Sequence, residues 1–216
     1  MTPLPPLAAA VWPALVGALA ILYANLGDGA WARRSAIAWM MGSWGARLTV
    51  QMLYTRLVRR PKSGRPEGLR YNETGKPESP RYNETGRPEG LHYLVWAASV
   101  LLFSLPALIA SRNPDPNLSV TELAACGLWI LAFAGETTAD RQLLRFAAKP
   151  ENAGLACRTG LWRYSRHAHA LFEGLIWIAF ALFASASPWG SIAFACPLAR
   201  VVLLSRDYGG KTPAVR

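Results

Sequence analysis

The sequence predicts an all-α integral membrane protein, a polytopic helical bundle with about six transmembrane helices. Three observations predict this fold class. Hydrophobic residues make up 52 % of the 216 residues and charged residues only 17 %, whereas a typical soluble domain is about 25 % charged. The apolar residues form runs long enough to cross a hydrocarbon core, which takes about 20 residues. The basic residues gather between alternate runs, as the positive-inside rule requires.

Six apolar runs are expected to form the helices. No Lys or Arg precedes the first run and no cleavage site follows it, so we interpret it as a retained span rather than a signal peptide. The second run carries Arg47 in its interior, and the fourth continues into a polar stretch that begins at Glu136. Pro197 and Arg200 interrupt the short sixth run, so the pattern is compatible with five to seven spans. The runs cover residues 7–26, 36–58, 93–110, 118–134, 170–186 and 189–204.

The distribution of basic residues predicts the orientation of the chain. Residues 59–92 carry eight Lys and Arg, residues 141–166 carry six, and the tail beyond Ala199 carries four. The opposite connections hold only Arg33, Arg34 and Arg112. Because cytoplasmic loops are the basic ones, we expect both termini in the cytoplasm and the protein in the bacterial inner membrane. The net charge of +10 then reflects a membrane surface, and we expect no nucleic-acid partner, which would require a basic face on a folded polar domain.

Residues 1–216 are expected to form a single transmembrane domain with one unusual connection. The loop at 59–92 contains an 11-residue repeat, which reads GRPEGLRYNET at 64–74, GKPESPRYNET at 75–85 and GRPEGLHY at 86–93. Gly and Pro in every unit exclude a helix here. The repeat is either a tandem duplication in a solvent loop or a basic turn, one copy of which contacts an anionic ligand.

The densest polar segment is expected to carry the chemistry. Glu136 and Asp140 are one helical turn apart, so both carboxylates face the same way. His169 and Glu173 have the same spacing at the start of the fifth run. An ionisable residue inside a span is costly unless it is paired or lines a cavity, which makes Glu173 a functional candidate. The alternative for the Arg and Tyr cluster at 163–166 is an anchor at the lipid headgroups.

We predict no metal site and no disulfide framework. His167 and His169 are two residues apart, so on a helix their side chains diverge by about 200°. The three cysteines are widely separated and lack metal-ligand spacing, which is typical of free thiols. They are Cys126, Cys157 and Cys196.

Residues 135–177 resemble the hallmark region of the steroid 5α-reductase C-terminal-domain family, in particular its bacterial members of the domain-of-unknown-function branch. The longest matching run is GLWRYSRH, from Gly160 to His167. The loop copy GKPESPRY at 75–82, together with Arg47 and Arg56, resembles a second region of that family. The other matching positions of the hallmark are Gly135, Glu136, Ala139, Asp140, Gln142, Leu143, Phe146, Pro150, Asn152, Gly154, Cys157, Glu173, Leu175 and Trp177.

The resemblance implies a helical bundle that opens to the cytoplasm and binds NADPH between its inner halves. It also implies an enzyme of the oxidoreductase class that transfers hydride to the β-carbon of a lipid-soluble α,β-unsaturated carbonyl compound. A lipophilic small molecule and membrane lipids are therefore the expected partners. The resemblance assigns no catalytic residue. The positions that it implies for cofactor binding are Arg81, Tyr82, Asp140, Arg163, Tyr164, Arg166, His169 and Glu173.

Two other functions stay open at this point. A membrane methyltransferase of the isoprenylcysteine type, which uses S-adenosylmethionine, has a related R-H-P-x-Y segment, but its paired acidic motif is absent after the sixth run. A non-catalytic member of the reductase family is the other alternative. It is favoured by Ala168 and Ala170, which replace the family's Pro and Tyr, and by Trp44, which stands near the position of a carbonyl-gripping Tyr.

Overall fold

The computed structural model describes residues 6–58, 89–152, 155–165 and 167–209, and within these ranges the chain is helical with no strand. The all-α class is therefore confirmed. The 11-residue repeat lies almost entirely outside the described residues. The elements are α1 Pro6–Leu26, α2 Trp31–Val58, α3 Glu89–Ala110, α4 Val120–Ala147, η1 Pro150–Asn152, η2 Gly160–Arg163, α5 Ala168–Ser185, η3 Gly190–Phe194 and α6 Ala195–Gly209.

The helices follow the predicted runs but are longer where the polar residues find partners. Helix α2 begins at Trp31 rather than Ala36, and α4 continues to Ala147 instead of ending with the apolar run at Ala134. The sixth run is helical as expected, but its first residues form the 3₁₀ helix η3, which continues directly into α6. Trp189 is the N-cap of η3 with a φ of 63°, a left-handed conformation that a bulky side chain rarely adopts.

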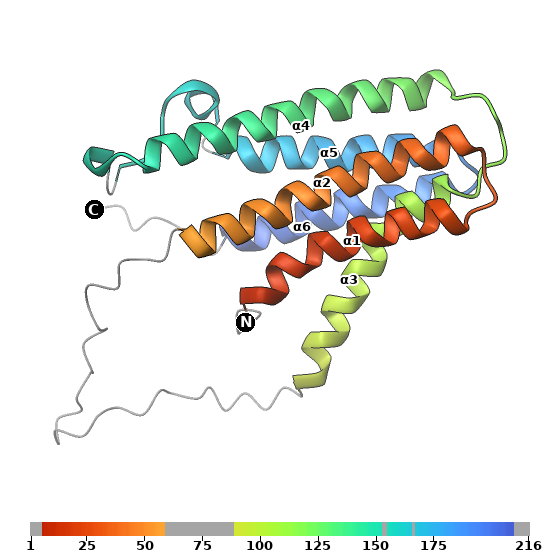
Figure 1. Ribbon diagram of the computed structural model, residues 1–216, viewed down its shortest axis with the longest axis horizontal. Helices are drawn as coiled ribbons and strands as arrows, with labels where there is room; N and C mark the ends of the chain where they lie inside the picture. Colours follow the sequence, from red (N-terminus) through yellow and green to blue (C-terminus); the bar gives the residue numbers. More distant parts are fainter. Residues whose placement is uncertain (1–5, 59–88, 153–154, 166, 210–216) are drawn as a thin grey trace.

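Successive helices run in alternating directions along one long axis, and α3 leans away from the others toward its first residues (Figure 1). We call the end that holds the connections 27–30, 111–119 and 186–189 the turn end. The other end holds the last turns of α2 and α4, the segments 148–152 and 155–165 and the first turn of α5, and we call it the basic end (Figure 1). Helix α1 begins toward the basic end, and α6 ends toward it (Figure 1).

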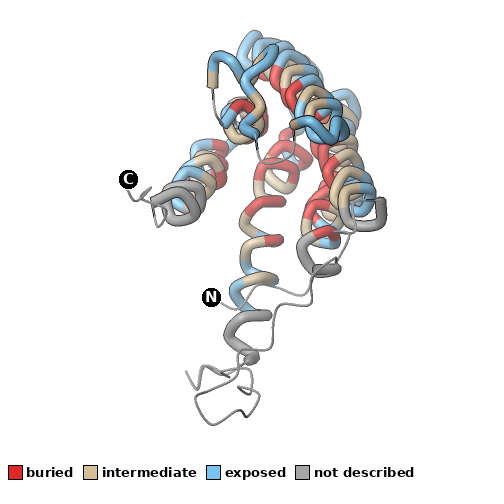
Figure 2. The backbone as a smooth tube through the Cα atoms, turned by 90° about the vertical axis from the view of Figure 1, so that its left-hand side faces the viewer, coloured by how far each residue is buried: buried red, intermediate tan, exposed pale blue. Residues whose placement is uncertain are grey.

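The core is a lengthwise seam between the helices. Buried residues line the inward faces and exposed residues the outer faces (Figure 2). At the centre of the seam, Trp44 and Trp177 are fully buried, with ring centroids 5.0 Å apart in an edge-to-face arrangement, a geometry that the ring quadrupoles favour. Phe103 and Phe180 pack edge-on against Trp177. An aromatic cluster thus joins α2, α3 and α5.

The outer faces of the helices are apolar. Among the described residues, α4 and α5 are long and apolar enough to cross a membrane, and shorter apolar stretches occupy 10–26, 94–110 and 190–202. Large hydrophobic side chains such as Trp39, Ile130 and Leu131 are exposed. An extended exposed apolar surface is typical of a protein that contacts membrane or partner. Length and composition thus qualify two of the six α-helices as spans.

Glycine allows the close approach of α1 and α2. A Cβ built on Gly45 would collide with the carbonyl oxygen of Pro13 and lie 3.3 Å from the Cα of Gly17. We expect Gly45→Ala to lower the free energy of unfolding by about 1–3 kcal/mol, because the backbone of α1 must move. Gly127→Ala on α4 is the control, since its Cβ would meet nothing within 4 Å, and we expect it to be neutral or stabilising by up to about 1 kcal/mol. Denaturant titration of helicity in detergent measures both, and equal effects would contradict the packing argument.

Candidate functional site

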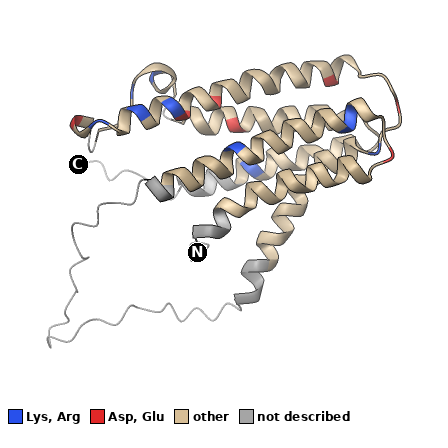
Figure 3. Cartoon of the chain, in the orientation of Figure 1, with Lys and Arg blue, Asp and Glu red and all other residues tan. Residues whose placement is uncertain are grey.

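Charged side chains from four helices meet inside the bundle, between its centre and the basic end. Figure 3 shows acidic and basic positions on neighbouring helices amid long stretches without charge. Because each charge would be costly alone in an apolar bundle, we treat the group as one unit and call it the ionic network. Its members are Arg47 of α2, Glu136 and Asp140 of α4, His169 and Glu173 of α5, and Arg200 of α6.

Arg47 binds both carboxylates of α4. Its Nη1 lies 2.8 Å from Oδ2 of Asp140, and its Nη2 contacts Oε2 of Glu136. The guanidinium also lies 5.2 Å from the ring centroid of Phe133, within the range of a cation–π interaction. The spacing of Glu136 and Asp140 predicts one shared face, and the structure confirms it because one guanidinium reaches both.

His169 connects the carboxylates of α4 to Glu173. Its Nδ1 lies 3.0 Å from Oδ1 of Asp140 and 3.5 Å from Oε1 of Glu136. Its Nε2 lies 3.8 Å from Oε2 of Glu173, so the predicted common face of His169 and Glu173 is confirmed. Arg200 then closes the network, because its Nε donates to Oε1 of Glu173 at 3.1 Å.

With all three carboxylates ionised, the ionic network is neutral when His169 is protonated. Three carboxylates then face two guanidiniums and one imidazolium. Glu136 is fully buried, and Asp140 and Glu173 are 7 % and 6 % exposed, so an uncompensated charge would be expensive to keep here. Neither oxygen of Glu136 has a hydrogen bond within the described part of the chain, although both lie within ion-pair distance of cationic groups. The network therefore retains acceptor capacity.

A pocket of about 310 Å³ opens beside the ionic network. Asp140 and His169 form its polar wall, so two members of the network face the pocket. The segment after α4 contributes Trp162 and His167 to the lining. The lining residues are Gln51, Asp140, Leu143, Trp162, His167, His169 and Ala170.

The 3₁₀ helix η2 is fastened to α4 and places Trp162 in the lining of this pocket. Oε1 of Gln142 accepts a hydrogen bond from the backbone N–H of Leu161 at 2.8 Å. The indole N–H of Trp162 donates to the carbonyl of Ala139 at 2.9 Å. Gly160 has a φ of 59°, and a Cβ there would overlap the side chain of Gln142, so only glycine suits this turn. These contacts explain structurally why Gly160, Leu161 and Trp162, which match the family hallmark, occupy this turn.

The predicted cofactor positions divide into three groups. Asp140, His169 and Glu173 come together in the ionic network. Arg163 and Tyr164 are exposed on and after η2, and no contact joins them to the network among the described residues. The remaining three, Arg81, Tyr82 and Arg166, lie outside the described residues.

Sequence reasoning missed two members of the network. The sequence places Arg200 at the end of the sixth run and counts it with the basic tail; in the structure it lies in α6 and pairs with Glu173. Arg47 is predicted in the interior of a span, and the cost of an unpaired charge there is the signal that a partner exists. In the sequence, Trp44 stands near the position of a Tyr that binds the substrate carbonyl in relatives. In the structure, Trp44 is buried in the aromatic cluster.

The arrangement also bears on metal binding. One ligand atom from each of Glu136, Asp140 and His169 lies within 4.8 Å of the others. Arg47 already pairs with both carboxylates, so a cation compensates their charge without a metal. The H-x-H pair does not converge, since His169 faces Asp140 while His167 is exposed.

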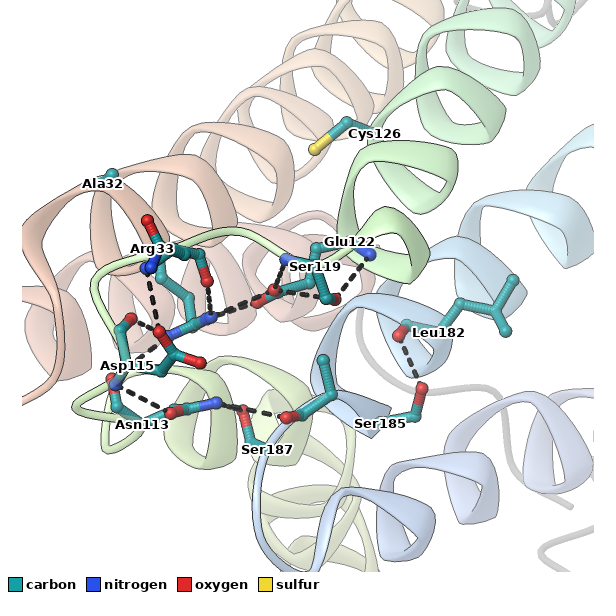
Figure 4. Close-up of polar contacts among 12 residues, drawn as sticks. Ala32, Arg33, Asn113, Asp115, Ser119, Glu122, Cys126, Leu182, Ser185 and Ser187 are labelled. Atoms are coloured by element: carbon teal, nitrogen blue, oxygen red, sulfur yellow. Dashed lines mark hydrogen bonds and ion pairs between the residues drawn. The ribbon is translucent and has the colours of Figure 1, made fainter.

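A second buried ion pair fastens the turn end. Arg33 of α2 and Glu122 of α4 are 1 % and 0 % exposed and bind each other through two contacts. The other donors of Arg33 reach the backbone carbonyls of Asn113, Asp115 and Asn117, and Ser119 donates its N–H and hydroxyl to Glu122 (Figure 4). We call this group the Arg33 clamp. From the sequence, Arg33 is recognised only as one of the three basic residues in the connections opposite the basic loops, and its role in packing is not predicted.

The Arg33 clamp extends to the last connection of the chain. The amide nitrogen of Asn113 lies 3.2 Å from both the carbonyl of Ala186 and the hydroxyl of Ser187 (Figure 4). The α3–α4 connection therefore contacts α2, α4 and the residues after α5. Because every donor of the guanidinium is used, the clamp is a structural element of the turn end.

The fold and the site define a class: an all-helical protein whose apolar bundle encloses an ionic network beside a small pocket. A family model described as "Protein of unknown function (DUF1295)" matches residues 7–211. The chain belongs to this family. No curated protein and no solved structure gives a significant match to the chain.

Proposed function

We propose that this protein is a membrane-embedded, NADPH-dependent reductase that reduces the C=C bond of a lipophilic enone. One observation carries the proposal. Three of the positions implied by the resemblance to the steroid 5α-reductase C-terminal-domain family, on two different helices, lie in one ionic network, and two of them line one pocket. These residues are Asp140, His169 and Glu173.

The proposal places all six helices in the membrane with both termini in the cytoplasm. The apolar character of α4 and α5 supports a membrane location. The alternating helix directions, with α1 starting and α6 finishing toward the basic end, support the orientation. A lipid-soluble substrate would enter such a bundle from the bilayer.

The residues beside the pocket fit the two chemical ends of NADPH. Carboxylates accept hydrogen bonds from hydroxyl and amide groups, which suits Asp140 and Glu173 to the ribose and the nicotinamide carboxamide. Phosphates instead prefer guanidinium donors. Exposed arginines supply these on the last turns of α4 and around η2, namely Arg141, Arg145, Arg158 and Arg163.

The bound cofactor would supply the hydride, while the chain must orient the substrate and polarise its carbonyl. Two buried donors are suited to this task. The indole N–H groups of Trp44 and Trp177 have no hydrogen-bond partner within the described residues. Trp44 precedes Arg47 by three residues and Trp177 follows Glu173 by four, so both indoles lie about one helical turn from the ionic network. A buried donor without a partner costs about 1–3 kcal/mol, and an acceptor oxygen of the substrate would satisfy it.

Equilibrium binding to the purified protein in detergent tests the proposed function. NADPH and S-adenosylmethionine are titrated separately against the full chain. We expect saturable binding of NADPH and none of S-adenosylmethionine. Saturable S-adenosylmethionine binding without NADPH binding would replace the reductase with the methyltransferase, and binding of neither would favour the non-catalytic alternative.

Trp44→Phe tests the carbonyl donor separately from cofactor binding. With a 3-keto-Δ4 steroid as the probe substrate, we expect kcat to fall by roughly 10²-fold, the effect of removing one oxyanion donor. The Kd for NADPH should not change. Trp96→Phe is the control, because it removes another buried indole N–H without a described partner from α3, which contributes nothing to the ionic network. A kcat equal in the two variants would exclude Trp44 as the donor.

A further inference from the structure

A groove of about 520 Å³ runs along the outer surface between α1 and α2 in the half of the bundle near the turn end. It lies away from the ionic network and none of its residues belongs to the proposed reductase site. Its floor is built from small side chains at helical spacing, Ala38, Gly42 and Ala46. Trp31 and Trp39 stand at its edges and are 75 % and 76 % exposed.

The polar groups along the groove are turned toward their own helices, so its walls are apolar. The hydroxyls of Ser35 and Ser43 donate to the carbonyls of Trp31 and Trp39 at 2.8 and 2.5 Å. The amide of Asn25 donates to the carbonyl of Ile21 at 2.8 Å. The two serine hydroxyls have thus spent their only donor on the helix, and Asn25, which keeps one N–H, lies toward the turn end of the groove. The long middle part of the groove therefore suits a hydrocarbon chain.

Arg34 supplies a positive charge at the turn end of the groove. Its Nη1 donates to the carbonyl of Gly27, and its buried Nε has no hydrogen-bond partner within the described residues. A guanidinium has five donors, so most of those of Arg34 are unused. Arg33, one residue earlier, is saturated in the clamp. An anionic group at Arg34 would meet a charge that no described carboxylate compensates.

The length of the groove matches one leaflet. From Arg34 to Ala46 the helix rises by about 18 Å, and half of a hydrocarbon core is about 15 Å. A ligand with its anionic headgroup at Arg34 would thus extend its chain to about the middle of the bilayer. A second copy of the protein fits less well, because a two-fold, parallel contact across α2 would bring the two Arg34 side chains together.

We propose that the groove between α1 and α2 binds an anionic phospholipid, with the phosphate at Arg34 and one acyl chain along Ala38, Gly42 and Ala46. This site takes a lipid of the leaflet at the turn end and is separate from the substrate of the proposed reductase. The proposed lipid site depends on the membrane location of the protein and does not depend on NADPH binding.

Native mass spectrometry of the detergent-solubilised full chain tests this site. Phosphatidylglycerol and phosphatidylcholine with identical acyl chains are titrated, and the binding constant of the tightest site is compared between variants. We expect Arg34→Gln to weaken phosphatidylglycerol binding about fivefold, the effect of one basic contact at a membrane surface, and to leave phosphatidylcholine unchanged. Arg112→Gln is the matched control, since Arg112 is an exposed arginine at the same turn end.

The acyl-chain part of the site is tested by filling the groove. Ala46 is exposed, so Ala46→Phe occupies the groove without repacking the core, and we expect it to weaken both lipids. Ala134→Phe, on the exposed surface of α4, is the control and should weaken neither. Equal binding by Arg34→Gln and Arg112→Gln, or by Ala46→Phe and Ala134→Phe, would overturn the proposal. A dimer mass that Ala46→Phe abolishes would also overturn it, by assigning the groove to a second copy.

Discussion

Replacing Arg33 with methionine is expected to lower the free energy of unfolding by about 3–5 kcal/mol, the cost of removing one partner of a buried ion pair. The carboxylate of Glu122 would stay fully buried and keep only its hydrogen bonds from Ser119. Three backbone carbonyls in the α3–α4 connection would also lose their donor. Chemical denaturation in detergent, followed by circular dichroism, measures the change.

Two further variants separate charge from packing in the Arg33 clamp. The double variant Arg33→Met, Glu122→Leu removes both charges, and we expect it to recover a large part of the loss, since apolar replacement of a complete pair is often neutral. Arg112→Met changes an exposed residue nearby and should stay within about 0.5 kcal/mol of the original protein. If Arg33→Met were as stable as Arg112→Met, the clamp would contribute nothing to the fold.

Asp140→Ala and Glu173→Ala are each expected to weaken NADPH binding by about 10-fold to 100-fold, as the loss of one hydrogen bond to a charged group would. Asp140 lines the pocket, and Glu173 orients His169 from the other side. Fluorescence titration of NADPH against the full chain measures both affinities. Helicity and stability are recorded for each variant, because removing one partner of a buried ion pair also destabilises the fold, and affinities are compared only under conditions in which the variants are folded.

Glu151→Ala is the control for the two carboxylate variants. Glu151 is an exposed acid in η1 at the same end of the bundle, so it changes the net charge equally without touching the ionic network. We expect it to bind NADPH like the original protein. Affinity that is unchanged in both Asp140→Ala and Glu173→Ala would show that the positions implied by the resemblance do not hold the cofactor in this chain.

Much of the fold could be predicted because it depends on local periodicity. Helices α1 and α3 end where their apolar runs end, at Leu26 and Ala110. The common face of Glu136 and Asp140 follows from the helical repeat alone, and both contact Arg47. The start of α2 and the end of α4 were missed, because their terminal turns depend on partners elsewhere in the chain.

The sequence by itself determined the all-α class, the approximate helix positions and which ionisable residues share a helical face, because these depend on neighbours within a few residues. Only the tertiary structure decided which faces meet. Arg47 and Glu136 are far apart in the chain, as are Arg33 and Glu122 and the helices of Glu173 and Arg200. Nothing in the periodicity of one helix specifies its partner. That choice depends on the complementary packing of the aromatic core and on placing each buried charge beside one that compensates it.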